Sequence, residues 1–216
     1  MLRKIKVLGL FLVVIGAGFF LRGSGIEGDG GFYKKEVADL DNNQTRESYS
    51  LEKGRLTIAE NSKVLWQSPK EWLIDDFILA DVDNDGRVDI NLSLWKRGNF
   101  GAVMPFWIKK NEMSLKNHFF VLNFGEKGVR EVWGSSNLSQ PNCEFQIADM
   151  DSDDKNELIV IEGSYGEKRE CRGEYLAIWE WDEWGFSNKW RSEKGEYSNL
   201  RIEKDGNENK IVAEGL

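Results

Sequence analysis

The chain contains few residues of the types on which metalloenzymes and nucleophilic enzymes depend. Its 216 residues include one histidine and two cysteines, which do not have the spacing of a zinc site. His118 precedes an apolar segment and has no serine or cysteine motif with which to form a catalytic pair. The sequence also lacks a glycine-rich phosphate loop, a nucleophile elbow and a zinc-binding helix. These absences make an enzyme the less favoured interpretation without excluding one.

Positive charge is also in short supply. The chain has 29 lysines and arginines against 37 aspartates and glutamates, a formal net charge of −8. Proteins that bind nucleic acid need a basic face for the phosphates, so a nucleic acid is not expected as a partner. The length and a hydrophobic content of 40% are sufficient for one buried core.

Only one long uncharged run is present. It extends from Val7 to Leu21 and follows Arg3, Lys4 and Lys6, which predicts an N-terminal hydrophobic helix within residues 1–22. This segment fits either a signal peptide or a short membrane anchor, and the sequence does not decide between them. The glycine-rich residues 23–31 are expected to form a linker. In both cases the remainder of the chain is expected to be extracytoplasmic, either anchored to the membrane or secreted.

An acidic segment between two strand-like flanks is the most informative motif. Its carboxylates occupy positions 1, 3, 5 and 9 of a nonapeptide, Gly86 provides a turn at position 6, and Arg87 offers a backbone carbonyl at position 7; the carboxylates are those of Asp81, Asp83, Asp85 and Asp89. Clustered carboxylates repel one another unless a cation lies among them, and Ca²⁺ prefers such oxygen ligands. An EF-hand would need a glutamate at position 12, where the chain has Leu92. The motif therefore predicts a calcium loop between two strands, and an acidic turn without an ion is the less favoured alternative.

Internal repeats extend this pattern through the chain. Residues 37–47 and 147–157 repeat the Ala-Asp-x-Asp core of the central loop, and a Trp-x-Ser motif follows each of the three loops, at Trp66, Trp133 and Trp190. The repeats lie near residues 32–70, 75–136 and 143–193, and a degenerate copy spans 196–216. In that copy Arg201 replaces the first aspartate, so no metal is expected there.

The segments between these markers predict short strands and few helices. Expected strands include residues 54–58, 104–108, 118–123 and 174–181. The repeat length fits a four-stranded propeller blade. The predicted fold is all-β, either a small β-propeller or an open propeller-like stack of about four four-stranded repeats.

The loops and their order resemble the FG-GAP/VCBS repeats, which bind calcium on β-propellers such as the integrin α head. The resemblance covers residues 32–216 and rests mainly on the Asp-x-Asp-x-Asp-Gly loop. It implies a propeller domain with Ca²⁺ as its cofactor. The implied ligands in the two better loops are Asp81, Asp83, Asp85, Arg87 through its carbonyl, Asp89, Asp149, Asp151, Asp153, Lys155 through its carbonyl, and Glu157. A weaker site is implied at Asp39, Asp41, Asn43 and Glu47, because Gln44 stands where the pattern has glycine.

The two cysteines, Cys143 and Cys171, lie within one repeat. In an oxidising compartment a disulfide between them is the favoured interpretation, and separate burial of two thiols is the alternative. Trp95 and Trp184 lie in turn-like stretches where an exposed ring could stack on a sugar or a protein, although use in the core is favoured for the tryptophans in general.

Two functions remain open at this point. The first is a calcium-stabilised binding or interaction module at the cell surface, with a protein or glycan ligand and a membrane contact through the N-terminal segment. The second is an extracellular hydrolase or lyase acting on polysaccharide, which would need two carboxyl groups facing each other across a cleft outside the metal loops.

Overall fold

The computed structural model describes residues 33–99, 109–206 and 208–215. The hydrophobic segment predicted at 1–22, the linker at 23–31 and the strand predicted at 104–108 lie outside these ranges. Within them, no helix is long and apolar enough to cross a membrane. The elements are β1 (Tyr33–Ala38), β2 (Glu47–Glu52), β3 (Arg55–Glu60), β4 (Lys63–Gln67), β5 (Leu73–Ala80), β6 (Asp89–Arg97), β7 (Leu115–Gly125), β8 (Gly128–Gly134), β9 (Asn142–Ala148), β10 (Glu157–Tyr165), η1 (Glu167–Arg169), β11 (Cys171–Asp182), β12 (Gly185–Arg191), β13 (Tyr197–Asp205) and β14 (Glu208–Gly215).

The all-β class expected from the sequence is confirmed. Consecutive strands pair antiparallel to form three four-stranded sheets, β1–β4, β5–β8 and β9–β12, which we call the first, second and third sheets. The hairpin β13–β14 forms a two-stranded sheet. Each sheet is a simple meander, because every connection joins neighbouring strands.

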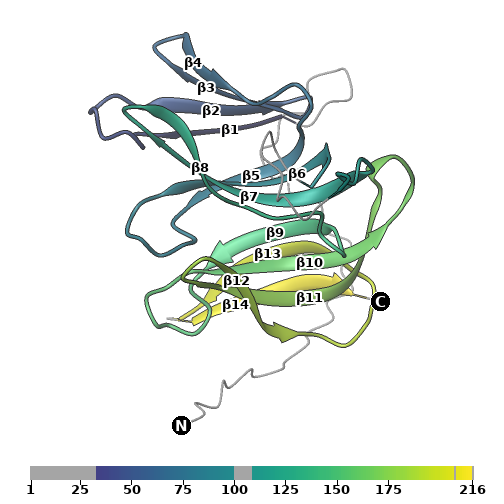
Figure 1. The fold of residues 1–216 in the computed structure, drawn as a ribbon. Helices are drawn as coiled ribbons and strands as arrows, with labels where there is room; N and C mark the ends of the chain where they lie inside the picture. Colours follow the sequence, from purple (N-terminus) through teal and green to yellow (C-terminus); the bar gives the residue numbers. More distant parts are fainter. Residues whose placement is uncertain (1–32, 100–108, 207, 216) are drawn as a thin grey trace.

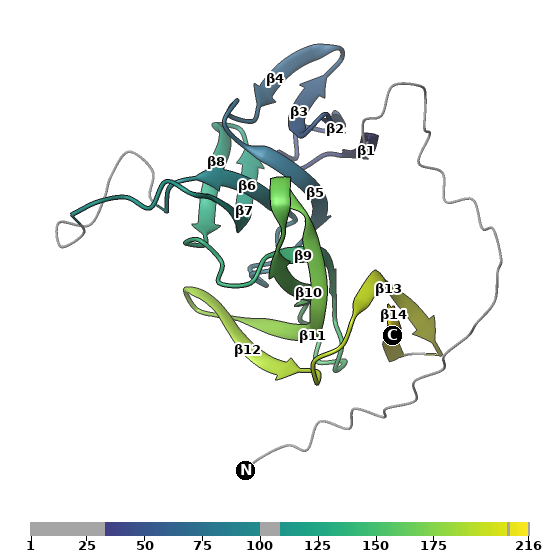
Figure 2. The same cartoon turned by 90° about the vertical axis from the view of Figure 1, so that its right-hand side faces the viewer.

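The four sheets follow one another along an arc (Figures 1 and 2). Successive first strands lie near one another, since β9 contacts β5 and β13 contacts β9. In Figure 2 the first sheet and the β13–β14 hairpin lie at the two ends of this arc. The described strands do not close into a ring, so of the two arrangements expected from the sequence they form the open one.

Burial along the second strand of each sheet reflects its place in this arc. In β2 buried and less buried residues alternate, as in a strand with one covered face, whereas eight successive residues of β6 and seven of β10 are buried. The apolar runs in β6 and β10 therefore suit strands that are covered on both faces. The first sheet is covered on one face among the described residues.

Three apolar clusters fill the spaces between the sheets. The first joins Tyr49, Leu51 and other residues of the first sheet to Phe77 and its neighbours in the second. The second cluster joins Phe119 and Val121 of the second sheet to the third, and the third cluster joins Ile159 and Ile161 of the third sheet to the β13–β14 hairpin. The core is thus a series of inter-sheet layers.

The serine of each Trp-x-Ser motif follows the fourth strand and binds back to the third strand. The Ser68 amide donates to the Leu56 carbonyl at 2.9 Å, and the Ser68 hydroxyl accepts the Leu56 amide at 3.2 Å. Ser135 makes the same pair of bonds with Phe119, and Ser192 with Leu176. The motif therefore satisfies two backbone groups where the ladder ends.

The degenerate fourth copy has lost its loop as well as its first aspartate. Arg201 lies inside β13, which continues to Asp205, and β14 begins at Glu208. Arg201 pairs with Glu203, and Asp205 pairs with Lys210. The acidic loop of the other repeats is therefore replaced by a tight hairpin.

A disulfide links Cys143 in β9 to Cys171 at the start of β11, with their Cα atoms 5.3 Å apart. It spans the third sheet beside Gly163 of β10. A Cβ atom at Gly163 would lie 2.5 Å from the Cys143 Sγ and 2.1 Å from the Arg172 carbonyl oxygen, so only glycine fits beneath the bridge.

Candidate metal sites

The three acidic loops occupy the same place in each sheet, between its first and second strands. Each loop brings three carboxylates together, with one oxygen of each within 4.8 Å of the others. These groups are Asp39, Asp41 and Glu47 in the first sheet, Asp81, Asp83 and Asp85 in the second, and Asp149, Asp151 and Glu157 in the third. All nine residues were singled out from the sequence as candidate ligands.

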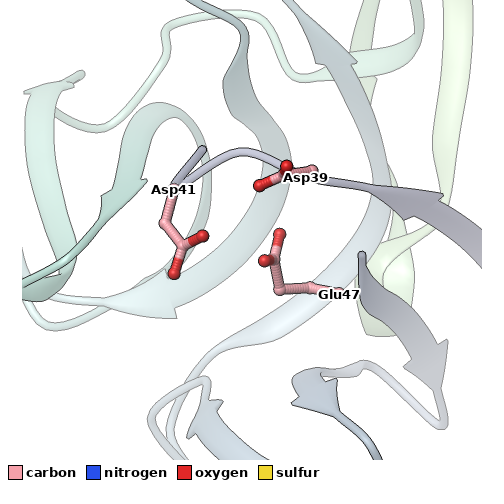
Figure 3. Close-up of side chains that lie close together, drawn as sticks. All are labelled: Asp39, Asp41 and Glu47. Atoms are coloured by element: carbon pink, nitrogen blue, oxygen red, sulfur yellow. The ribbon is translucent and has the colours of Figure 1, made fainter. Parts of the chain in front are cut away.

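In the first loop the carboxylates of Asp39, Asp41 and Glu47 point toward one another (Figure 3). Glu47 is fully buried at the start of β2, and its Oε2 accepts the Tyr49 hydroxyl at 2.9 Å and the Leu40 amide at 3.0 Å. Asn43 uses its side-chain nitrogen to bind Asp41 and its Oδ1 to accept the Thr45 amide. The side-chain amide of Asn43 is thus engaged within the loop.

The second loop is wrapped around Asp81. Its Oδ1 accepts the Asp85 amide at 3.1 Å and its Oδ2 accepts the Gly86 amide at 2.9 Å. Gly86 has a φ of 88°, the left-handed conformation that favours glycine. Asp85 also pairs with the Arg87 guanidinium at 3.0 Å. Asp89, the fourth predicted acidic ligand, is buried at the start of β6.

The third loop has the same backbone pattern around Asp149. Its Oδ1 accepts the Asp153 amide at 3.2 Å, and its Oδ2 accepts the Asp154 amide at 3.1 Å. Glu157 begins β10, is 7% exposed and accepts the Met150 amide at 2.7 Å. Asp153 accepts the Lys155 amide at 3.0 Å and is not in the group of three carboxylates that converge.

The buried carboxyl groups of the two better loops are hard to ionise without a counterion. Burial, reinforced by the Asp83 carboxylate, raises the pKa of Asp89 to about 7. Burial also raises the pKa of Glu157 to about 7, with the Asp151 carboxylate adding to the effect. The pKa values of Asp83 and Asp151 are raised for the same two reasons, burial first and then neighbouring carboxylates. A cation in each loop would oppose all of these shifts.

Two buried carboxylates, one in the first loop and one in the second, carry an oxygen without a hydrogen-bond partner among the described residues. They are the Oε1 of Glu47 and the Oδ2 of Asp89. A buried carboxylate oxygen without a partner costs free energy, and a metal ion is one partner that would remove the cost. The chemistry of these loops, oxygen donors on a turn, fits a hard cation such as Ca²⁺.

The second and third loops are joined to each other by hydrogen bonds that no sequence pattern indicates. The Asn156 amide donates to the Asn84 side chain at 2.8 Å, and the Asn156 side chain donates to the Asp81 carbonyl at 2.7 Å. Asn209 of β14 makes the corresponding bond to the Asp149 carbonyl at 2.7 Å. In the second loop the position of Asn156 is taken by Val88, which has no polar side chain to reach the first loop.

The two tryptophans considered for ligand stacking differ in exposure. Trp95 is 2% exposed and its Nε1 donates to Asp75, so it belongs to the core and the idea of an exposed ring there is wrong. Trp184 is 82% exposed in the β11–β12 turn.

Comparisons with family models, with curated proteins and with solved structures found no match to this chain.

Proposed function

We propose that this chain is an exported, calcium-stabilised binding module of the FG-GAP/VCBS type, with a β-propeller-like arrangement of its repeats. Ca²⁺ occupies the second and third loops and, more weakly, the first. The module recognises a protein or glycan ligand at the cell surface, and the N-terminal segment 1–22 either anchors it in the membrane or directs its export.

The observation that carries this proposal is the recurrence of one arrangement in three sheets. In each, three carboxylates converge in the loop and a buried carboxylate begins the second strand, at Glu47, Asp89 and Glu157. Glu47 and Glu157 belong to the converging groups of their loops, whereas the group in the second loop consists of Asp81, Asp83 and Asp85. An acidic residue rarely occupies such a position without a partner. Because buried carboxylates recur at equivalent positions, the three repeats are expected to share one function. A bound cation would give these carboxylates the positive partner that they lack.

Two further features support the remaining parts of the proposal. Meander sheets that follow one another along an arc with their first strands in succession are the arrangement of propeller blades (Figure 2). The Cys143–Cys171 disulfide favours an oxidising compartment outside the cytoplasm.

A polysaccharide hydrolase or lyase is the alternative function. Glycosidases of the usual kind need two carboxyl groups on opposite sides of the bond that breaks. The pocket between the second and third sheets contains one carboxyl group, that of Glu162, and the three groups of converging carboxylates found in the described residues all lie in the loops. This arrangement favours binding over hydrolysis.

Calorimetric titration of the full-length chain with Ca²⁺ tests the proposal. We expect about two tighter sites, of which Asp83→Ala removes one and Asp151→Ala the other. Asp205→Ala makes the same change of charge in the hairpin that has lost its loop, and should leave both sites intact. Absence of calcium binding by the unaltered protein would refute the proposal.

Removal of calcium should also lower thermal stability. A ligand bound only by the folded state adds about 2.7 kcal/mol when its concentration is a hundredfold above its dissociation constant. A change of this size lowers the melting temperature by about 2–4 °C per kcal/mol in a domain of this length. Melting curves with EGTA measure the effect. Mg²⁺ should restore stability poorly, because it requires a tighter octahedral shell.

A further inference from the structure

A cavity of about 150 Å³ lies between the second and third sheets, and none of the loop carboxylates lines it. Four aromatic side chains contribute to its wall: Phe119, Trp133, Trp179 and Phe186. The ring of Phe186 packs edge-to-face against Phe119 at 5.6 Å and against Trp133 at 5.2 Å, so these side chains hold one another in place. A cavity of this volume accommodates a single six-membered ring.

A buried carboxylate lines the same cavity. Glu162 is 3% exposed, its Oε1 accepts the Trp179 Nε1 at 2.9 Å, and its Oε2 lies 2.5 Å from the Arg191 Nη2. The Arg191 side chain also lines the cavity and is 39% exposed. Arg191 neutralises the carboxylate, so the cavity has little net charge. A carboxylate can accept about four hydrogen bonds, and these two partners leave part of that capacity for a ligand.

Comparison with the preceding repeat indicates that this carboxylate is a departure from a packed core. Glu162 lies 13 residues after Asp149, and the residue 13 positions after Asp81 is Leu94. Leu94 is fully buried in the apolar cluster between the first and second sheets. The chain therefore places a charged group, at the cost of its desolvation, where the neighbouring layer has a leucine.

The backbone around Glu162 is irregular in its pairing with both neighbouring strands. The pairing of β10 with β9 shifts at Ile161/Glu162, and its pairing with β11 shifts at Glu162/Gly163. Such bulges redirect side chains and are common beside binding sites. The adjacent Gly163 is held under the Cys143–Cys171 disulfide, which stiffens this end of the sheet.

The connection between β8 and β9 brings further polar groups to the cavity. Ser139, Gln140 and Asn142 all line it; Ser139 is exposed and Gln140 is half-buried. Asn142 is 8% exposed, so its amide is largely hidden from water. Aromatic walls beside several polar side chains suit a ligand that has an apolar face and a hydroxylated edge.

We propose that this cavity binds one neutral pyranose unit of a glycan. The aromatic rings pack against the apolar face of the sugar, and Glu162, Arg191 and the amide side chains exchange hydrogen bonds with its hydroxyl groups. A cationic ligand would compete with Arg191 for Glu162, and an anionic ligand would meet the Glu162 carboxylate, so a neutral ligand fits best. The inference rests on the proposed binding function and specifies its ligand.

The test uses the full-length chain with a panel of neutral methyl pyranosides, the α- and β-methyl glycosides of glucose, galactose, mannose and N-acetylglucosamine. Saturation-transfer NMR identifies binding, and tryptophan fluorescence gives the dissociation constant. At least one pyranoside should bind. Glu162→Gln should weaken it about tenfold or more, because the ligand loses a hydrogen bond to a charged group. Trp133→Ala should weaken it similarly, and Trp184→Ala, which alters an exposed ring outside the cavity, should not.

Glu162→Leu separates loss of binding from loss of folding, because it introduces the leucine found at the equivalent position of the neighbouring layer. This variant should still unfold cooperatively but should no longer bind the sugar. Failure of every pyranoside to bind would overturn the inference, as would unchanged affinity in Glu162→Leu. Binding of tetramethylammonium in place of any pyranoside would also overturn it. Calcium titration of the same samples separates the two proposals: protein that binds Ca²⁺ but no pyranoside refutes this inference alone.

Discussion

The two layers on either face of strand β6 are held together by different chemistry. Leu94 faces the first sheet within an apolar cluster, whereas its neighbour Ser93 faces the third sheet in a hydrogen-bonded chain. In that chain the Asn117 side chain donates to Ser93 at 3.2 Å and accepts the Asn142 amide at 3.0 Å. Hydrogen bonds between loops add to the second layer, through Asn156. In the first layer Lys34 donates to Asp76 at 3.0 Å and the Ile74 amide donates to the Gly54 carbonyl at 3.0 Å, around an apolar cluster. In the second layer a chain of buried side-chain hydrogen bonds also fixes how the third sheet sits on the second.

Truncation in the first layer should give the largest effect. Phe77→Ala removes a fully buried ring from the cluster between the first and second sheets and should lower the free energy of unfolding by about 3–5 kcal/mol. Phe145→Ala tests the equivalent ring in the second layer, where the hydrogen bonds remain. Urea unfolding measures both. Val37→Ala is the control, because Val37 is 54% exposed. A loss below about 1 kcal/mol for Phe77→Ala would contradict the dependence on packing.

The disulfide distinguishes the third sheet from the other two. Replacing both Cys143 and Cys171 by serine frees a loop with a sequence separation of 28 and should cost about 3.5 kcal/mol by chain entropy. Urea unfolding with and without reductant provides the measurement: reductant should destabilise the unaltered protein and have no effect on the double variant. Equal stability of the two proteins under oxidising conditions would contradict the prediction.

Acid should weaken the first layer through His118, which is paired with Leu94 across β6 and β7. Burial lowers the pKa of His118 from 6.5 to about 4, so the fold favours the neutral ring. The resulting stability is complete above the unfolded pKa and is lost as the pH falls toward the folded pKa. From about pH 7.5 to 5.5 the loss should be roughly 1 kcal/mol.

The comparison with His118→Asn isolates this contribution. The asparagine amide can donate to the Ser135 carbonyl, as the His118 Nδ1 does at 3.0 Å, and does not titrate. Measurements in excess Ca²⁺ keep the loop carboxylates of both proteins in one state. If the two proteins lose stability in parallel between these pH values, His118 is not responsible.

Loosening the contact between the second and third loops should give the smallest effect. Asn156→Ala removes the 2.7 Å bond to the Asp81 carbonyl and should cost about 1 kcal/mol. It should also weaken calcium binding at the second loop, although Asn156 belongs to the third. Val88→Ala is the matched control, since Val88 is the equivalent residue of the second loop, and it should change stability by less than about 0.5 kcal/mol. Calorimetric titration and urea unfolding measure the two effects.

Several features could be predicted because they depend on residues close together in sequence. The three acidic loops, the all-β class and the strands β3, β7 and β11 follow from local spacing and alternation, and η1 is the one short helix in the ranges that the structure describes. The hairpin that replaces the fourth loop was anticipated only in part: Arg201 signalled the loss of a metal site, but the continuation of β13 through it depends on pairing with β14.

The sequence by itself determined where carboxylates gather, because nine or so residues around one turn bring them together whatever the rest of the chain does. The tertiary structure alone decided which residues meet across the sheets. Asn84 and Asn156 are 72 residues apart, and the cavity at Glu162 is formed by strands of two sheets. These contacts form because β6 and β10 are covered on both faces by neighbouring sheets. The apolar sequence of such a strand predicts that it is buried, but it does not predict which strands cover it.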